Sequence, residues 1–228
     1  MEEEELQEYK DYLREGLLKY TRKAFRTLPK MAMPRILDIG CGSGVPTMEL
    51  ARLSQGEVTG IDIDQPALDK LTNKIIEVGL TDRVQAVNCS ILDMDFPDAS
   101  FDIIWAEGSI AVIGFEKGIK ECGRLLKTGG FLVVHDDLGD ITEKRRQISK
   151  CGYELVKHFV LNDDIWWNEY YAPLEKKLNE VRAKHPVDQK TIALLDDDQR
   201  EIDAFSPERY RSVFFIMRKE EDHIIISK

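Results

Sequence analysis

The sequence has few of the features that mark metal-binding, disulfide-linked or membrane-spanning proteins. Its four cysteines lie 48, 33 and 29 residues apart, without the close pairs that zinc or redox motifs need. No run approaches the roughly 18 apolar residues of a membrane span. Glu2 to Glu5 follow Met1 where a basic and apolar leader would stand. We therefore expect a cytoplasmic protein with reduced thiols and no membrane anchor.

Basic charge is also scarce. Lys and Arg number 32 against 42 Asp and Glu, a formal net charge of −10. Such a surface repels phosphate backbones and anionic lipid, so nucleic acid is not expected as a partner. The 15 Gly and 8 Pro are too few for a low-complexity chain, and hydrophobic residues at 43% can form a core. We expect one globular domain over residues 1–228.

An alternation of strand and helix patterns is what the sequence does contain. Short apolar runs predict strands at residues 35–39, 58–62, 84–88, 101–106, 131–135, 153–161 and 213–217. Helices are predicted from Gly44 to Gly56, from an Asp64 cap to Gly79, and over 115–126. The second helix is expected to bury Leu68, Leu71, Ile75 and Val78. Gly129-Gly130 is expected to form a turn.

Two further segments are predicted to cover this core. Apolar residues at helical spacing predict an amphipathic helix within residues 1–28: Leu6, Tyr9, Leu13, Leu17 and Tyr20. Residues 162–209 are expected to form a small helical cap. A helix within the cap is expected to begin at Pro173, because proline is tolerated in a first turn and breaks a helix interior.

Three alternate glycines follow the first predicted strand, in Asp38-Ile39-Gly40-Cys41-Gly42-Ser43-Gly44. A side chain at those positions would block a tight turn or the close approach of a ligand. Asp62 ends the second predicted strand, where a carboxylate can accept both hydrogen bonds of a ribose diol. A dinucleotide fingerprint requires glycine where Val45 stands, which disfavours a nicotinamide cofactor.

Four segments in this order resemble the class I S-adenosylmethionine-dependent methyltransferases. They are the glycine loop from Asp38 to Gly44, Asp62, Phe96 to Asp102, and Leu125 to Gly130. The resemblance is close over residues 35–137 and loose elsewhere. It implies an α/β, Rossmann-like, seven-stranded sheet, mostly parallel with an antiparallel final strand and helices on both faces. It also implies S-adenosylmethionine as the cofactor. No metal is expected, because the histidines lack the spacing of metal ligands.

The resemblance also implies which residues meet the cofactor. The loop would cradle its methionine and ribose part, and Asp62 would hold the ribose hydroxyls. Ser90 stands where the family usually has an acidic residue for the adenine amino group, so the Ser90 hydroxyl and the Ile91 backbone would take that role. The predicted cofactor residues are Asp38, Gly40, Cys41, Gly42, Gly44, Asp62, Ile63, Ser90, Ile91 and Glu107.

Two side chains at strand ends are candidates for a general base. Methyl transfer from a sulfonium is an in-line displacement, in which the protein orients the nucleophile and excludes water. A base helps when the nucleophile carries a proton of high pKa. Glu107 and His135 follow the fourth and fifth predicted strands. Capping or surface solvation is an equal alternative for both.

Aromatic residues are the candidates for substrate-pocket walls, because their faces attract a cationic sulfonium. The predicted pocket residues are Tyr12, Trp105, Trp166, Trp167, Tyr170 and Tyr171. Core or lid packing is the alternative for them, and for the Trp-Trp and Tyr-Tyr pairs it is the favoured one. The sequence predicts a methyltransferase acting on a small organic acceptor. The alternatives are a non-catalytic S-adenosylmethionine-binding module and a dinucleotide-dependent oxidoreductase.

Overall fold

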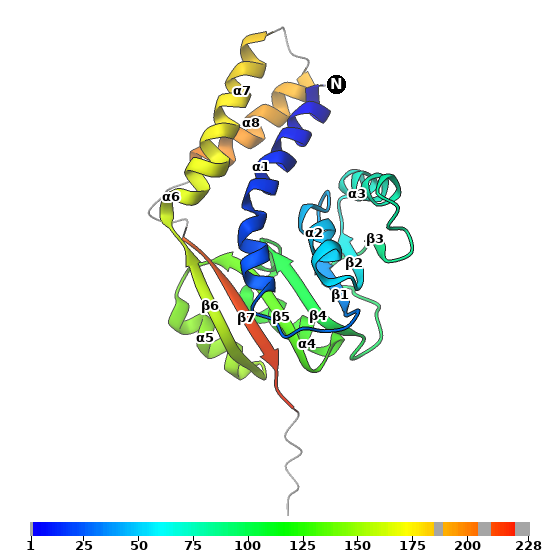
Figure 1. Ribbon diagram of the computed structural model, residues 1–228. Coiled ribbons are helices and arrows are strands. Elements are labelled where there is room, and N and C mark those ends of the chain that lie inside the picture. The colour runs from blue at the N-terminus through cyan, green and yellow to red at the C-terminus, as the bar shows by residue number, and fades with distance from the viewer. Residues whose placement is uncertain (1, 185–188, 205–210, 222–228) are drawn as a thin grey trace, which may run out of the picture.

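The fold is seen in a computed structural model that describes residues 2–184, 189–204 and 211–221. Within these ranges one seven-stranded sheet has the order β3-β2-β1-β4-β5-β7-β6 (Figure 1). The strands are β1 (Arg35–Ile39), β2 (Glu57–Asp62), β3 (Val84–Asn88), β4 (Phe101–Glu107), β5 (Leu126–Asp137), β6 (Tyr153–Leu161) and β7 (Ser212–Lys219). The first five strands in this order, β3-β2-β1-β4-β5, are parallel to their neighbours, and β7 is antiparallel to both β5 and β6. The predicted fold class is confirmed.

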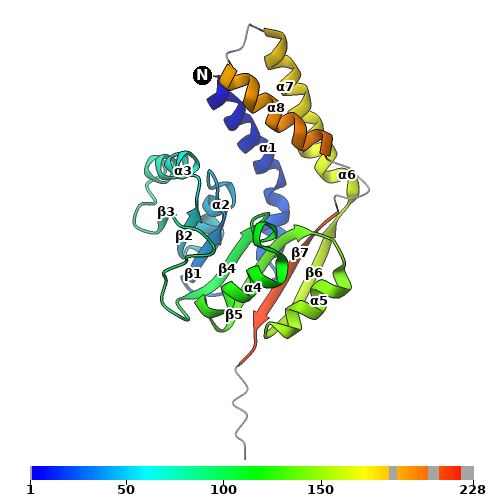
Figure 2. The same ribbon diagram turned by 180° about the vertical axis from the view of Figure 1, so that it is seen from behind.

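Helices cover both faces of the sheet (Figures 1 and 2). The helices are α1 (Glu2–Phe25), α2 (Val45–Ser54), α3 (Gln65–Glu77), α4 (Phe115–Leu125), α5 (Ile141–Lys150), α6 (Asp163–Trp166), α7 (Ala172–Lys184) and α8 (Gln189–Ala204). A 3₁₀ turn, η1 (Ile110–Ile113), precedes α4, and a π-helical turn, η2 (Trp167–Tyr171), joins α6 to α7. None of these helices has the length and apolar composition to cross a bilayer.

Alternation along the central strands divides the core into two layers. In β4, Ile103 and Trp105 pack with α2, α3 and the end of α1, whereas Ile104 and Ala106 pack with α4 and α5. Successive side chains of a strand point to opposite faces, and a sheet covered on both sides therefore has nearly continuous apolar strands. A ligand site is expected at the edge of the sheet formed by the carboxyl ends of the parallel strands.

A third apolar cluster lies away from the sheet. The first half of α1 extends beyond the strands and lies beside α7 and α8 (Figures 1 and 2). Residues from α1, η2, α7 and α8 form the cluster: Leu6, Leu13, Tyr170, Tyr171, Leu174, Leu178, Val181, Leu195 and Ile202. Of the predicted 162–209 cap, residues 185–188 and 205–209 lie outside the described ranges.

Several local predictions are confirmed and two are wrong. β1, β3 and β6 have the predicted bounds, and Asp64 caps α3 by accepting a hydrogen bond from the Ala67 N–H. Val78 is not buried, because α3 ends at Glu77 and Val78 is 59% exposed. Gly129-Gly130 is not a separate turn, because β5 already begins at Leu126 and carries both glycines through an irregular stretch of its pairing with β4.

The prediction that a helix begins at Pro173 is confirmed to within one residue, because α7 begins at Ala172, but the proline does not interrupt the helical backbone before it. Helical backbone runs without interruption from Asp163 through Pro173 to Lys184. The π-helical turn η2 precedes the proline, and the Ala172 N–H bonds to the carbonyl of Trp167, five residues back. Such a widened turn accommodates groups that do not fit the ordinary hydrogen-bond ladder of a helix.

Candidate active site

The loop between β1 and α2 is held in a tight conformation by its glycines. Gly40, Gly42 and Gly44 have φ of 70°, 52° and 84°, a region that residues with a Cβ rarely adopt. The N–H groups of Gly40 and Cys41 both donate to the carbonyl of Ile61, at 2.8 and 3.0 Å. These bonds fix the loop at the end of β2.

The three glycines have different surroundings. A Cβ on Gly40 would lie 2.3 Å from the Cβ of Ser109, and one on Gly44 would lie 2.2 Å from Cδ1 of Leu71. These two positions are therefore required for protein packing. A Cβ on Gly42 would have no neighbour within 4 Å. Gly42 is the position where a ligand can approach the backbone of the loop.

Asp62 holds the loop with both carboxylate oxygens. Oδ2 accepts the Gly42 N–H at 2.8 Å, and Oδ1 accepts the Asp64 N–H at 3.0 Å. An ionised carboxylate can accept about four hydrogen bonds, so Asp62 retains acceptor capacity. Ile63 beside it is 73% exposed. This pair presents a polar group and an apolar side chain at the end of β2.

Asp38 is a buried carboxylate beneath the same loop. Its Oδ2 accepts a hydrogen bond of 2.6 Å from Thr47 Oγ1 on α2. Burial raises the pKa of Asp38 to about 7; the hydrogen bond from Thr47 opposes this increase, and the charges of Glu107 and Asp62 contribute to it. The Cys41 thiol is also buried, and burial raises its pKa. Asp38 thus serves as an internal support of the loop.

Glu107 ends β4 and is held from two elements. Its Oε1 accepts hydrogen bonds from Trp105 Nε1 at 2.7 Å and from Thr21 Oγ1 of α1 at 2.8 Å. Burial raises the pKa of Glu107, whereas the two hydrogen bonds lower it. Trp105 is fully buried. It therefore supports Glu107 from within the core and does not face an open pocket.

His135 lies next to Glu107 across the β4–β5 pair. Its ring stacks on Phe214 at 4.2 Å and on Trp166 at 5.7 Å between centroids. Nε2 is buried and has no hydrogen-bond partner among the described residues. Burial lowers the pKa of His135 to about 3, so the imidazole is neutral at physiological pH.

The other predicted residues are spread over a wider area. Ser90 accepts a hydrogen bond from the Leu92 N–H at 3.2 Å, and Ile91 is half-buried against the core. Tyr12 is 66% exposed on α1. Tyr170 and Tyr171 are buried between α1 and the cap helices, with Trp166 and Trp167 packed against them. Of these four residues, only Trp166 stacks on His135, one of the two predicted catalytic residues.

The residues by which α1 contacts the site were not predicted from the sequence. Asp11 accepts hydrogen bonds from Ser43 Oγ at 2.6 Å and from Lys74 Nζ at 2.8 Å, and these bonds hold its pKa low although burial opposes them. Thr21, which reaches Glu107, is likewise buried. Asp11 and Thr21 lie on the otherwise apolar, buried side of an amphipathic helix. Polar residues at such positions are the sequence signal that could have indicated a contact with the site.

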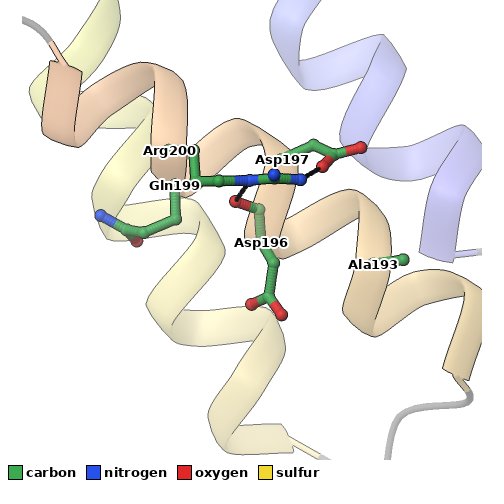
Figure 3. Close-up of a pocket in the computed structure, with 5 residues that line it drawn as sticks. All are labelled: Ala193, Asp196, Asp197, Gln199 and Arg200. Atoms are coloured by element: carbon green, nitrogen blue, oxygen red, sulfur yellow. Dashed lines mark hydrogen bonds and ion pairs between the residues drawn. The ribbon is translucent and has the colours of Figure 1, made fainter.

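Surface hollows occur elsewhere on the molecule. One lies on α8, where Arg200 pairs with Asp197 (Figure 3). Its lining residues are Ala193, Asp196, Asp197, Gln199 and Arg200. A second hollow lies between the starts of α4 and α5 and includes Gly114 and Lys144. Neither is lined by Gly42, Asp62 or Glu107, so the candidate site rests on the strand-end geometry described above.

Comparison with known proteins identifies the domain. Residues 36–130 match the family described as "Methyltransferase domain". The 27-O-demethylrifamycin SV methyltransferase of Amycolatopsis mediterranei is 32% identical over 127 residues, which cover 55% of this chain and 47% of that protein. A sterol 24-C-methyltransferase of Neurospora crassa is 32% identical over 181 residues, covering 65% and 47%. The chain thus spans about half the length of these curated relatives.

A solved structure has the same architecture. The [4+2]-cyclase SpnF superposes with a TM-score of 0.74 at 20% identity, covering 89% of this chain and 81% of that chain. At this identity the likeness shows the shared fold. The strand order, the glycine loop with Asp62 and the matched domain agree with one another. Residues 36–130 are thus similar to a methyltransferase domain, and the chain has the fold of a methyltransferase-type α/β domain.

Proposed function

We propose that this chain binds S-adenosylmethionine at the glycine loop and transfers its methyl group to a small organic acceptor. The observation that carries the proposal is the position of Glu107. It is a half-buried carboxylate at the end of β4, close enough to Asp38 beneath the loop to raise the pKa of that group. A base in this place lies at the edge of the sheet where ligands of such folds bind.

The residues around the loop fit the cofactor. Gly42 leaves open space beside the backbone, and Asp62 retains acceptor capacity for two ribose hydroxyls. The exposed side chain of Ile63 offers an apolar surface for the adenine ring. The Ser90 hydroxyl and the Ile91 backbone are proposed to meet its polar edge. Cys41, Gly40, Gly44 and Asp38 shape the loop.

The protein's part in the chemistry is to orient the acceptor and remove a proton. When bound, the sulfonium supplies an electrophilic methyl group. Glu107 would accept the acceptor's proton, and burial brings its pKa nearer to neutral pH, where a base works best. His135 would hydrogen-bond the acceptor through Nε2. Because its pKa is about 3, we assign it binding and leave the base role to Glu107.

The small organic acceptor is proposed to be compact and partly apolar. The names of the relatives refer to a rifamycin and to sterols, which are organic compounds and not macromolecules. Trp166 and Phe214 flank His135 with aromatic faces. We propose that α1 and the 162–209 cap cover this site within a single domain, with Tyr12, Trp167, Tyr170 and Tyr171 in the cover. The net charge of −10 favours such an acceptor over nucleic acid.

Transfer of a labelled methyl group tests the proposal. The protein is incubated with methyl-labelled S-adenosylmethionine and a panel of hydroxylated sterols and macrocyclic polyketides. We expect label in at least one panel member. Glu107→Gln is expected to lower the rate by roughly 10²–10⁴-fold, the usual contribution of a general base, without loss of cofactor binding. Glu57→Gln, an exposed glutamate at the start of β2, is the matched control and should retain the rate.

A second function is supported by one observation. The solved structure of matching fold is described as a [4+2]-cyclase, so this architecture also serves enzymes named for other reactions. Cofactor binding without methyl transfer to any panel member would favour such a use, or a non-catalytic S-adenosylmethionine-binding module. Equal loss of binding and transfer in Glu107→Gln would remove Glu107 from the base role.

A further inference from the structure

A threonine of the N-terminal helix reaches the end of β4. Thr21 is buried, and its Oγ1 donates to Oε1 of Glu107 at 2.8 Å. A threonine inside a helix often returns its hydroxyl to a carbonyl of the preceding turn, as Thr72 does with Leu68 at 2.8 Å. Thr21 instead directs this bond to a carboxylate 86 residues away in the sequence.

The two oxygens of Glu107 have different surroundings. Oε1 accepts both the Thr21 hydroxyl and the Trp105 indole N–H. Oε2 accepts no hydrogen bond from the described residues. Two donors from two separate elements, α1 and β4, restrict rotation of the carboxylate, because turning it lengthens at least one of the bonds. Oε2 is therefore the oxygen available to a ligand.

The segment of α1 that carries Thr21 is fixed in place on both sides. Arg22, the next residue, pairs with the largely buried Glu49 of α2 at 2.6 Å. Ala24 is fully buried against the sheet layer that contains Trp105. Ten residues before Thr21 in the same helix, Asp11 accepts a hydrogen bond from Ser43 of the glycine loop at 2.6 Å. One helix thus contacts both the cofactor loop and the candidate base.

We propose that Thr21 is a positioning residue that holds Glu107 with Oε2 directed to the acceptor, so that the N-terminal helix completes the active site. The inference rests on the proposed function of Glu107. It adds that the base depends on a residue outside the matched methyltransferase segment, which begins at residue 36.

The same hydrogen bond favours the ionised form of Glu107. Burial raises the pKa of this carboxyl group, and the bonds from Trp105 and Thr21 oppose that increase. Asp38 faces Glu107 from beneath the loop, where the charge of Glu107 raises the pKa of Asp38, and His135 beside Glu107 is neutral. Loss of the Thr21 hydroxyl should therefore raise the pKa of Glu107 and leave less carboxylate at neutral pH.

The indole N–H of Trp105 provides a direct readout. The chain has three tryptophans, so a ¹⁵N–¹H spectrum contains three indole signals, and Trp105→Phe identifies the one of interest. Protonation of Glu107 removes charge from the acceptor of this N–H and should shift its signal. We expect the titration midpoint to move to higher pH in Thr21→Val. Thr21→Ser, which keeps the hydroxyl, should restore the original midpoint.

Two controls make the result decisive. Glu107→Gln should remove the titration step from the Trp105 signal. A midpoint in Thr21→Val equal to that of the unmodified protein contradicts the proposal, as does a Trp105 signal that does not titrate in the unmodified protein. Thr21→Ala replaces Thr21→Val if the latter does not fold. Calorimetry with S-adenosylmethionine on the same samples tests the proposed function separately. A Thr21-dependent midpoint without cofactor binding would refute the function and with it the positioning of a base, and would leave only the effect of Thr21 on the pKa of Glu107.

Discussion

Substitution of Gly42 by alanine separates ligand contact from protein packing in the glycine loop. Replacing Gly40 or Gly44 would push a Cβ to within 2.3 Å of Ser109 or 2.2 Å of Leu71, so a loss of binding there would be ambiguous. At Gly42 the new methyl group meets no protein atom within 4 Å. The remaining cost to folding is the left-handed backbone, about 1–2 kcal/mol.

Gly79 offers a matched control. Its φ is 67°, against 52° at Gly42, and a Cβ added there would also have no atom within 4 Å. Both alanine variants should therefore lose about 1–2 kcal/mol of unfolding free energy in urea titration. Gly42→Ala should also bind S-adenosylmethionine at least tenfold more weakly, about 1.4 kcal/mol. Gly79→Ala should bind it normally. Equal affinities in the two variants would refute the role of Gly42 as the ligand-facing glycine.

Two further predictions concern buried charges. Because the folded pKa of Asp38 is about 7 against 3.8 when unfolded, the folded state binds more protons between these values. The unfolding free energy of the unmodified protein should therefore fall by up to roughly 4 kcal/mol, relative to Asp38→Asn, as pH rises from 4 to 7. A constant difference would contradict this assignment. Lys144 pairs with the buried Asp136 at 2.8 Å, so Lys144→Met should cost about 3–5 kcal/mol. Lys150→Met, at an exposed pair, should cost under about 1 kcal/mol, and similar losses would refute the distinction.

The strands and the glycine loop were predictable because their signals are local. Each apolar run of five residues is sufficient to indicate a strand covered on both faces, and β1 and β3 have the predicted bounds. Asp64 followed by Pro66 is a local signal for a helix start and was confirmed. Asp62 was placed at a strand end by the same reasoning, and its bond to Gly42 shows that the two are adjacent.

The contacts of α1 were not predictable because they depend on how separate elements dock. Periodicity gives the apolar side of a helix, but it does not say which strand end that side meets. Thr21 and Glu107 are 86 residues apart, and Asp11 and Ser43 are 32 apart. Trp105 shows a related limit. The sequence predicted the strand that contains Trp105, but the burial of Trp105 follows from α1 and α2 covering that face of the sheet.

Parallel calorimetric titrations with S-adenosylmethionine, S-adenosylhomocysteine and NADH test whether the glycine loop binds S-adenosylmethionine. We predict micromolar binding of the first two ligands, about −8 kcal/mol, and no binding of NADH, because Val45 stands where a dinucleotide loop requires glycine. Binding of NADH in place of the other two, or of none of the three, would contradict the assignment of the glycine loop to S-adenosylmethionine.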